Sequence, residues 1–496
     1  MRNIIIWGGT NYKWLWVPFA ARIKNEHAAR VHFICTNEYS IKYWKAQDAA
    51  GVIDTFTTTG HFFLSYDQLA DSSDEIGKQA RAYEEKYGVY VSDILQADRH
   101  LGRGFFAAGI GHPRSQLSAK SDYVKSMNAC VEAFKFWEEY FNRIQPDLVI
   151  GFVSGIVGKT CTAVAQKRGI PVRALTHAGY QEYFYWSEDE YYSNSLVEKY
   201  FNDAKNVPTF TGGDELKELK RVPWTHANYQ DTLKQKSLRS VLRLSLRQIK
   251  IQTAKRLRKN VTGGNYLLRD NLKFFWQRYC DIRAFDRMKL AALQDLEGKA
   301  YVLYPIHMEP ETALGMKSPE FNEQLALIEL IAKNLPAGVL LVVKEHLAAI
   351  GRRPKDFYKI ILDIPNVAMV SPNSYAVELA KGAKAVAVIT STLGAEAAML
   401  GIPVLSFGLH NVYNFLKHVH VVTSWMKLRP LLKQLCSEVE PSRRQQWVDD
   451  GLRFLDALKK TAIDLSWSDY VPKDREPATE REIQVFYASL MGSLKR

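Results

Sequence analysis

The sequence has few cysteines and no long apolar run, and both shortages narrow the class of protein. Its five cysteines are far apart and form no Cys-x-x-Cys pair in 496 residues, which argues against a disulfide framework and a zinc site. Apolar runs such as Val339–Val343 are short, and none approaches the roughly 18–20 residues of a membrane-spanning helix. The N-terminus, MRNIIIWGG, predicts a first β-strand and not a secretory signal. We therefore expect a cytoplasmic protein.

Acidic residues are outnumbered by basic ones. The 53 Asp and Glu against 66 Lys and Arg leave a net charge of +13. This excess favours an anionic partner such as a nucleotide, a nucleic acid or a membrane surface. The hydrophobic share of 47% is that of an ordinary globular protein, and the length allows two or three domains.

Residues 1–205 alternate predicted strands and helices. Apolar runs predict strands at Asn3–Trp7, Val31–Cys35, Val52–Thr57, Asp147–Phe152 and 169–179, and helical spacing predicts helices near 14–23, 122–144 and 159–168. Strands that alternate with helices of this length indicate βαβ units and a mostly parallel sheet. We interpret residues 1–205 as a Rossmann-like domain.

Residues 296–425 repeat the same alternation. Strands are expected at Tyr301–Tyr304, Gly338–Lys344, Val367–Val370, Ala385–Ile389 and Pro403–Phe407, with a helix expected at Ala395–Leu400. The fold class is therefore α/β, with two Rossmann-like domains. Ligands of open α/β sheets bind beyond the carboxyl ends of the strands, so we expect the site in a central cleft between the domains. Residues 426–496 are expected to form helices.

The connector, residues 206–295, contains a basic amphipathic helix. Lys234–Lys259 holds ten Lys or Arg and no Asp or Glu. Leucines recur at helical spacing beside a basic stripe made of Arg239, Arg243, Arg247 and Lys250. Such a helix suits an anionic membrane surface, and a solvated helix packed on its own domain is the simpler alternative. No nucleic-acid module accompanies it, so we expect no nucleic-acid partner.

Polar loops follow two of the C-terminal strands. In YPIHMEPE, His307, Glu309 and Glu311 follow the first strand and suit sugar hydroxyls or acid–base chemistry. In VVKEH, Lys344 and His346 follow the next strand and suit a phosphate leaving group. A polar loop that caps a helix and an internal ion pair of Lys344 with Glu345 are the structural alternatives.

A third segment, ITSTLGAEAA, predicts a strand, a hydroxyl-rich turn and a helix. The free N–H groups of a helix N-terminus suit phosphate, with hydroxyls from Thr390, Ser391 and Thr392. Gly394 would allow close approach of the backbone, and Glu396, placed in the first turn, would accept from a ribose diol. Plain N-capping by Ser391 or Thr392 is the alternative.

The N-terminal domain offers acceptor-side and catalytic candidates. The acceptor-side set is Gly8, Gly9, Thr10, Asn11 and His100, and the catalytic set adds Asp98 and His177 to the glutamates Glu309 and Glu311. The turn after the first strand lacks the full Gly-x-Gly-x-x-Gly pattern, so we expect no dinucleotide cofactor. The alternating pair His418 and His420 has no evident third ligand, so we expect no metal.

The ordered series YPIHMEPE, LPAGVLLVVKEH, IPNVAMV and TSTLGAEAAMLGIPVLSFG resembles the bacterial capsule and surface-polysaccharide biosynthesis proteins. That family usually has proline after Lys-Glu-His, where this chain has Leu347. The family is similar to GT-B glycosyltransferases and in part to capsular Kdo transferases. The resemblance implies a C-terminal helix that crosses back onto the first domain, a nucleotide-sugar donor held by the C-terminal domain, and a glycan or lipid-linked glycan acceptor held by the N-terminal one.

The resulting prediction is a metal-independent GT-B glycosyltransferase of surface-glycan assembly (capsule, O-antigen or lipopolysaccharide), on the inner face of the cell membrane. Two alternatives stay open. One is a nucleotide-sugar epimerase or polyol-phosphate transferase on the same scaffold, and the other is a non-catalytic subunit of a glycan-assembly complex.

Overall fold

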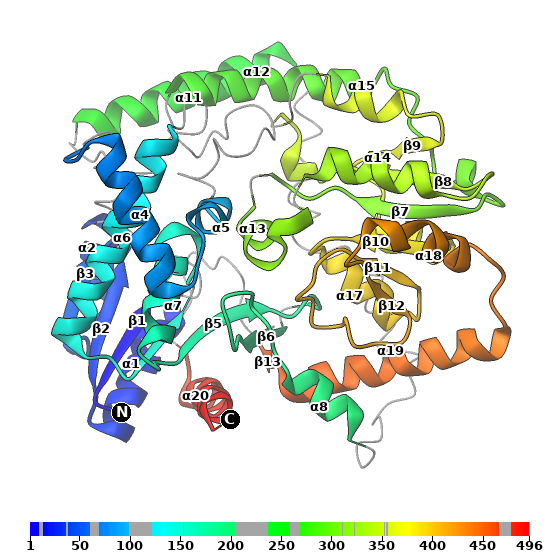
Figure 1. Cartoon of the computed structure of the whole chain (residues 1–496). Coiled ribbons are helices and arrows are strands. Elements are labelled where there is room, and N and C mark those ends of the chain that lie inside the picture. Colours follow the sequence, from blue (N-terminus) through cyan, green and yellow to red (C-terminus); the bar gives the residue numbers. More distant parts are fainter. Residues whose placement is uncertain are drawn as a thin grey trace.

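Two mainly parallel β-sheets, one in each half of the chain, organise the molecule (Figure 1). The computed structural model describes residues 1–8, 13–35, 38–59, 69–98, 122–151, 153–181, 183–203, 237–257, 268–309, 311–321, 323–351, 353, 356–465 and 478–495. Gly9, Thr10, Asn11 and His100, proposed from the sequence as acceptor-side residues, lie outside this part of the chain.

The N-terminal sheet has seven strands. Their order is β13 (Ile463–Asp464), β6 (Tyr183–Trp186), β5 (Val172–His177), β4 (Leu148–Gly151), β1 (Asn3–Trp7), β2 (Arg30–Cys35) and β3 (Thr55–Thr58). The strands from β5 to β3 are parallel, and β6 joins β5 in antiparallel pairing. The apolar run Ile4–Ile6 of β1 is fully buried, as expected for a central strand covered on both faces.

Helices cover the faces of this sheet. They are α1 (Lys13–His27), α2 (Glu38–Gln47), α4 (Ser73–Tyr87), α5 (Val91–Gln96), α6 (Tyr123–Ile144) and α7 (Gly155–Lys167). Helix α8 (Leu196–Asn202) packs instead on the C-terminal segment. The longest, α6, begins after Asp122, whose side chain accepts from the Lys125 N–H at 3.2 Å. It ends at Gln145 in a left-handed conformation with φ of 52°. These caps satisfy backbone groups that have no partner within the helix.

The C-terminal sheet has six parallel strands. Their order is β12 (Val419–Val421), β11 (Val404–Ser406), β10 (Ala385–Val388), β7 (Tyr301–Pro305), β8 (Leu340–Lys344) and β9 (Val367–Val370). Its helices are α13 (Thr312–Lys317), α14 (Gln324–Asn334), α15 (Phe357–Leu362), α16 (Ala376–Gly382), α17 (Thr392–Met399) and α18 (Leu428–Leu435), with 3₁₀ turns at Gln294–Leu296, Pro319–Phe321, Leu347–Ala349 and Trp425–Lys427. In chain order the sheet runs 3-2-1-4-5-6 from β9, the order of a Rossmann domain.

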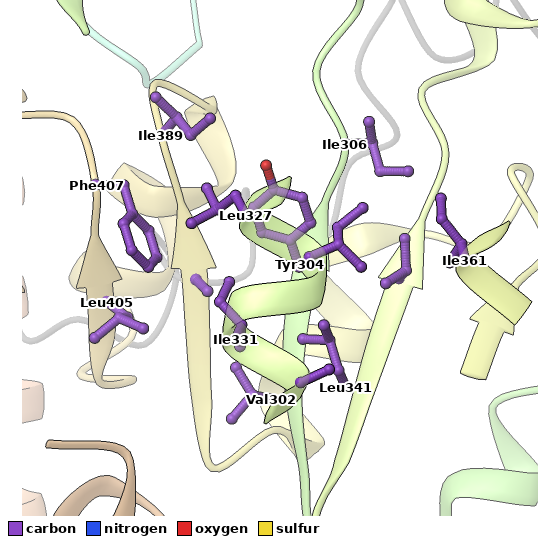
Figure 2. Packing of buried hydrophobic residues seen from close by; sticks show 14 of the residues in the cluster. Val302, Tyr304, Ile306, Leu327, Ile331, Leu341, Ile361, Ile389, Leu405 and Phe407 are labelled. Carbon is purple, nitrogen blue, oxygen red and sulfur yellow. The ribbon is translucent and has the colours of Figure 1, made fainter. Parts of the chain in front are cut away.

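The core of this domain joins the sheet to its helices. Figure 2 shows Leu327 and Ile331 of α14 lying over Val302 and Tyr304 of β7 and Leu341 of β8. Each of these side chains is at most 1% exposed. This packing fixes where β7 and β8 end, and therefore where the loops beyond them begin.

Two connector helices, α11 (Leu238–Leu257) and α12 (Leu268–Phe285), pack against each other. The far end of α12 joins the C-terminal domain, where Ile282 and Phe285 enter its core and Asp281 accepts from the Gly351 N–H at 2.9 Å. Figure 1 shows α11 along the outer edge of the molecule, away from both sheets.

The C-terminal segment crosses back to the first domain. Helix α19 (Pro441–Thr461) packs against both α17 and α8. Strand β13 then extends the N-terminal sheet beside β6, and α20 (Glu480–Leu494) packs on α1. Two Rossmann-like domains joined by a C-terminal crossover make a GT-B-like architecture, which confirms the fold class predicted from the sequence. The expectation of helices alone over residues 426–496 is wrong at β13.

Candidate functional site

The best-supported site lies at the topological switch point of the C-terminal sheet, between β7 and β10. There the two strands are neighbours, and their chain connections leave in opposite directions, which is where ligands of open α/β sheets bind. His307 follows β7 and Thr390 follows β10. The Thr390 N–H donates to Nε2 of His307 at 3.2 Å, so one hydrogen bond spans the switch point.

The orientation of the His307 ring is fixed from several sides. Gln324 of α14 accepts from the His307 N–H at 2.6 Å and donates back to its carbonyl at 3.1 Å. Because Nε2 accepts from Thr390, the ring proton of a neutral His307 is on Nδ1. That atom lies 3.7 Å from Oε2 of Glu311. His307 therefore connects the β10 turn to a carboxylate on the β7 loop.

Behind this loop, Arg353 joins two carboxylates in the protein interior. Its guanidinium donates to Glu345 at 2.8 Å through both Nε and Nη2, to Glu309 at 2.9 Å, and to the His307 carbonyl at 2.6 Å. Arg353, Glu345 and Glu309 are 1%, 0% and 7% exposed. Burial raises the pKa of Glu309, and the charge of Arg353 opposes that rise. Sequence patterns did not indicate this network, because Arg353 is separate from both motifs.

Lys344 and His346 differ in environment. Lys344 is buried and its ammonium donates to the carbonyls of Pro372 at 3.0 Å and Glu345 at 3.4 Å. Burial lowers the pKa of Lys344 to about 8, against the charge of Glu345. The side chain of His346 is exposed; desolvation by the surrounding protein lowers its pKa, which Glu311 and Glu345 oppose. The ion pair considered for Glu345 forms with Arg353 and not with Lys344.

The turn between β10 and α17 begins the helix. Ser391 is the N-cap and accepts from the Leu393 N–H at 3.3 Å, while Thr392 is exposed. The Thr390 hydroxyl is buried and has no hydrogen-bond partner among the residues that the structure describes. A buried hydroxyl without a partner costs free energy, so this atom is suited to a ligand. A Cβ on Gly394 would lie 2.1 Å from Oη of Tyr413, so packing alone requires glycine there.

Glu396 lies in the second turn of α17, four residues after the first helical residue, Thr392. The expectation that it would lie in the first turn is wrong, because the helix begins three residues before the predicted start at Ala395. Glu396 is half-buried, and burial raises its pKa to about 7. No side-chain hydrogen bond or ion pair is found for it in the described part of the chain.

Lys317, at the end of α13, is a candidate that sequence reasoning missed. Its ammonium lies 5.9 Å from the ring centroid of Tyr192 in the N-terminal domain. Burial lowers the pKa of Lys317 to about 8, which the charge of Glu311 opposes. Burial lowers the pKa of His177, and the charge of Lys317 adds to that effect. A six-residue helix without a marked pattern gave no signal in the sequence.

The two domains meet around this site. A Cβ on Gly315 of α13 would lie 2.4 Å from the carbonyl of Gln96, beside α5. A Cβ on Gly179, which has φ of 83°, would lie 2.9 Å from Cβ of Ala395 in α17. Both close approaches require glycine. The first places α13 against the end of α5, and the second places the loop after β5 against the first turn of α17.

The N-terminal candidates have structural partners. Both ring nitrogens of His177 are used: Nε2 pairs with the Gln181 carbonyl at 2.6 Å, and Nδ1 accepts from the Gly179 N–H at 3.0 Å. Asp98 is buried and accepts from the Ile156 N–H at 2.9 Å at the start of α7. A Cβ on Gly8 would lie 2.0 Å from Phe33. The catalytic role of Asp98 and His177 and the acceptor role of Gly8 stay predictions.

The structure thus brings together His307, Glu311, His346, Thr390 and Lys317, with His177 facing them from the other domain. The basic stripe of α11 lies elsewhere, on the connector. In the part of the chain that the structure describes, no group of three or more His, Cys, Asp or Glu is placed to hold a metal ion. No described helix is long and apolar enough to cross a membrane.

Fold and site together define a GT-B-like α/β protein with its best-formed site in the C-terminal domain. Residues 237–416 match the family of capsule polysaccharide biosynthesis proteins. The match covers a little over a third of the chain and includes β7, β8, β10 and α17. It confirms the resemblance inferred from the residues. No curated protein matches the sequence.

Solved structures share little sequence with this chain. UDP-GlcNAc 2-epimerase from Neisseria meningitidis, bound to UDP-GlcNAc, is 14% identical over 93% of this chain and 98% of that one, with a TM-score of 0.26. KpsC from Thermosulfurimonas dismutans, described as a β-Kdo 2,4 transferase, is 12% identical over 62% and 79%, with a TM-score of 0.32. Such low scores do not establish a shared arrangement, so the fold assignment rests on the strand order.

Proposed function

We propose that this protein is a glycosyltransferase that moves a sugar from a nucleotide-sugar donor to a growing bacterial surface glycan. The observation that carries the proposal is the switch-point site. Among the described residues, neither the buried hydroxyl of Thr390 nor the half-buried carboxylate of Glu396 has a hydrogen-bond partner, and the imidazole of His307 lies beside Thr390. The family match over residues 237–416 supports a role in capsule assembly.

The donor phosphate would bind at the turn that begins α17. Backbone N–H groups at a helix N-terminus favour anions, and the Thr390 hydroxyl adds a donor. The exposed His346 and the half-buried Lys317 would add positive charge as the phosphate leaves. Lys344 would act less directly, because its ammonium already donates to two backbone carbonyls. Glu396 would accept from the ribose diol.

The transfer step breaks the bond between the anomeric carbon and the leaving phosphate oxygen, and forms a bond to an acceptor hydroxyl oxygen. The hydroxyl proton passes to a base. Of the predicted carboxylates, Glu311 suits this task better than Glu309. Its side chain is 34% exposed and faces His307, whereas Glu309 is buried and already paired with Arg353. The acceptor, a glycan or lipid-linked glycan at the inner face of the membrane, would approach from the N-terminal domain.

A thermal-shift screen of the full chain against CMP, UDP, GDP, dTDP and CDP tests the donor assignment. A ligand at about 100 times its dissociation constant stabilises the folded state by about 2.7 kcal/mol. A selective shift that is abolished in Glu396→Gln supports the proposal and identifies the donor base. An unchanged shift in Glu396→Gln would reject the role of that residue. No shift with any nucleotide would reject the donor site and favour a non-catalytic subunit.

The epimerase alternative is distinguished by the reaction itself. An epimerase converts its nucleotide sugar when no acceptor is present, whereas a transferase requires the acceptor for rapid turnover. Incubating the protein with the nucleotide sugar identified by the screen, with and without a glycan acceptor, separates the two. Release of an isomerised nucleotide sugar without acceptor would contradict the transferase proposal.

A further inference from the structure

Helix α11 presents a row of apolar side chains to solvent. Leu238, Leu242, Leu246 and Ile249 are 58%, 61%, 57% and 39% exposed. Their spacing of four, four and three residues places them on one face of the helix. The helix packs against α12 and lies along the outer edge of the molecule in Figure 1. We call these four residues the apolar row. Leucines on a helix normally face a core, so a contiguous exposed row indicates a binding surface.

The basic stripe borders the apolar row on one side. Arg239, Arg243, Arg247 and Lys250 are all exposed, and each follows a member of the row by one residue, about 100° around the helix. No Asp or Glu occurs from residue 234 to residue 259. An apolar face beside cations is the pattern of helices that lie in the interface of a membrane.

We propose that α11 docks on an anionic lipid surface, with the apolar row entering the headgroup region and the basic stripe contacting lipid phosphates. Charge complementarity selects this occupant. A second copy of the chain docked through the same helix would bring two basic stripes together, and their repulsion would oppose the contact. The proposal does not depend on sugar transfer, because vesicle binding requires neither donor nor acceptor.

The docking surface is connected to the candidate site through α12. That helix packs against α11. Arg278 of α12 donates to the carbonyl of Ile350 at 3.4 Å, and Asp281 holds the Gly351 N–H. Residues 350 and 351 precede Arg353, which holds the loops after β7 and β8. Helix α12 therefore links the docking helix to the segment that holds these two loops.

Co-sedimentation with vesicles tests the proposal. Phosphatidylcholine vesicles are compared with vesicles in which part of the phosphatidylcholine is replaced by phosphatidylglycerol. Wild-type protein should sediment with the anionic vesicles only. Arg239→Gln/Arg243→Gln/Arg247→Gln should weaken this binding by roughly tenfold or more, since each surface cation adds attraction. Leu242→Gln/Leu246→Gln keeps every charge and should also weaken binding by roughly tenfold or more, through lost apolar insertion.

A matched control removes the same net charge elsewhere. Lys417, Lys433 and Arg444 are exposed residues of the C-terminal domain, and their replacement by Gln should leave vesicle binding within about twofold of wild type. If the control weakens binding as much as the stripe variant, the attraction is a general charge effect and the proposal fails. It also fails if the leucine variant binds vesicles like wild type. It fails too if light scattering shows that wild-type protein is a dimer and that the leucine variant is a monomer. Unchanged nucleotide-induced thermal shifts would show that these variants leave the donor site intact.

Discussion

Nη1 of Arg353 donates to Oε2 of Glu309 over 2.9 Å, and both side chains are buried. This contact joins the segment that follows β8 to the loop that follows β7. The Nε–Nη2 edge of the guanidinium donates to the two carboxylate oxygens of Glu345, each at 2.8 Å. One cation thus pairs with two buried carboxylates and holds the two strand-end loops together. Although burial alone would lower the pKa of Arg353, the two carboxylates raise it, so its charge is permanent.

Replacing Arg353 by Met should strongly destabilise the C-terminal domain. The substitution leaves Glu309 and Glu345 buried without their cation, a loss that costs about 3–5 kcal/mol for a buried pair. Urea unfolding followed by tryptophan fluorescence measures it. The control Lys381→Met breaks the exposed pair with Glu378 on α16 and should cost less than about 1 kcal/mol. Equal losses in the two variants would contradict the interpretation of Arg353 as the residue that joins these loops.

The strand framework could be predicted from the sequence because each central strand is an uninterrupted apolar run. Ala385–Val388 consists only of Ala and Val and is fully buried, so its composition alone identifies it as a central strand. The positions of the polar residues could then be predicted, because His307 and Thr390 lie in the loops that begin where these strands end. Strand β13 could not be predicted, because a two-residue pairing with β6 depends on a partner about 280 residues away.

Contacts between segments distant in the sequence account for the remaining differences. The role of Arg353 could not be predicted, because only the folded loops bring two carboxylates to it. Lys317 had no signal because the ring beside it, Tyr192, comes from the N-terminal domain. Gly394 was assigned to donor approach, yet Tyr413 occupies the space beside it. Side-chain neighbours of this kind are properties of the tertiary structure.

Glu396 should make stability depend on pH in an identifiable direction. Its pKa in the folded protein, about 7, is above its ordinary value of 4.5. The folded state therefore holds the proton more tightly than the unfolded state, and the free energy of unfolding falls as pH rises from about 4.5 through 7. Glu396→Gln removes this dependence. Relative to wild type, the variant should gain on the order of 2–3 kcal/mol between pH 5 and pH 8.

Urea unfolding at several pH values measures this gain, with Glu378→Gln as the control. Glu378 is on the neighbouring helix α16, and its side chain is 43% exposed, so its variant should follow the wild-type pH profile. Parallel profiles for wild type and Glu396→Gln would show that the Glu396 carboxylate is not desolvated, and would remove one argument for its role at the ribose.

Asp98 should stabilise the folded protein at the start of helix α7. Its carboxylate accepts from the Ile156 N–H, so Asp98→Ala should cost about 1–2 kcal/mol by leaving that N–H without its acceptor. Asp98→Asn keeps an oxygen at the same position and should retain most of that stability. Thermal unfolding of the two variants measures the difference. A fully stable Asp98→Asn protein that binds nucleotide but transfers no sugar would instead support the base role predicted from the sequence.

Lys317 should bind the donor phosphate directly. Lys317→Met is expected to weaken nucleotide binding at least tenfold, as expected for the loss of a charge-assisted contact, and Lys317→Arg should restore part of it. The pKa of Lys317 in the free protein is about 8, so the ammonium loses its proton as pH rises through 8. Wild-type affinity should therefore fall as pH rises through 8, and this fall should be reduced in Lys317→Met. Isothermal titration with the nucleotide selected by the thermal-shift screen measures both effects.

Lys344 has a similar pKa, so Lys344→Met is measured in parallel. The ammonium of Lys344 faces backbone carbonyls, so its loss should affect stability more than affinity. Lys333→Met, which removes an exposed ion pair with Glu329, should change neither. If Lys317→Met binds the nucleotide with wild-type affinity, Lys317 does not contact the phosphate, because the loss of such a contact would weaken binding.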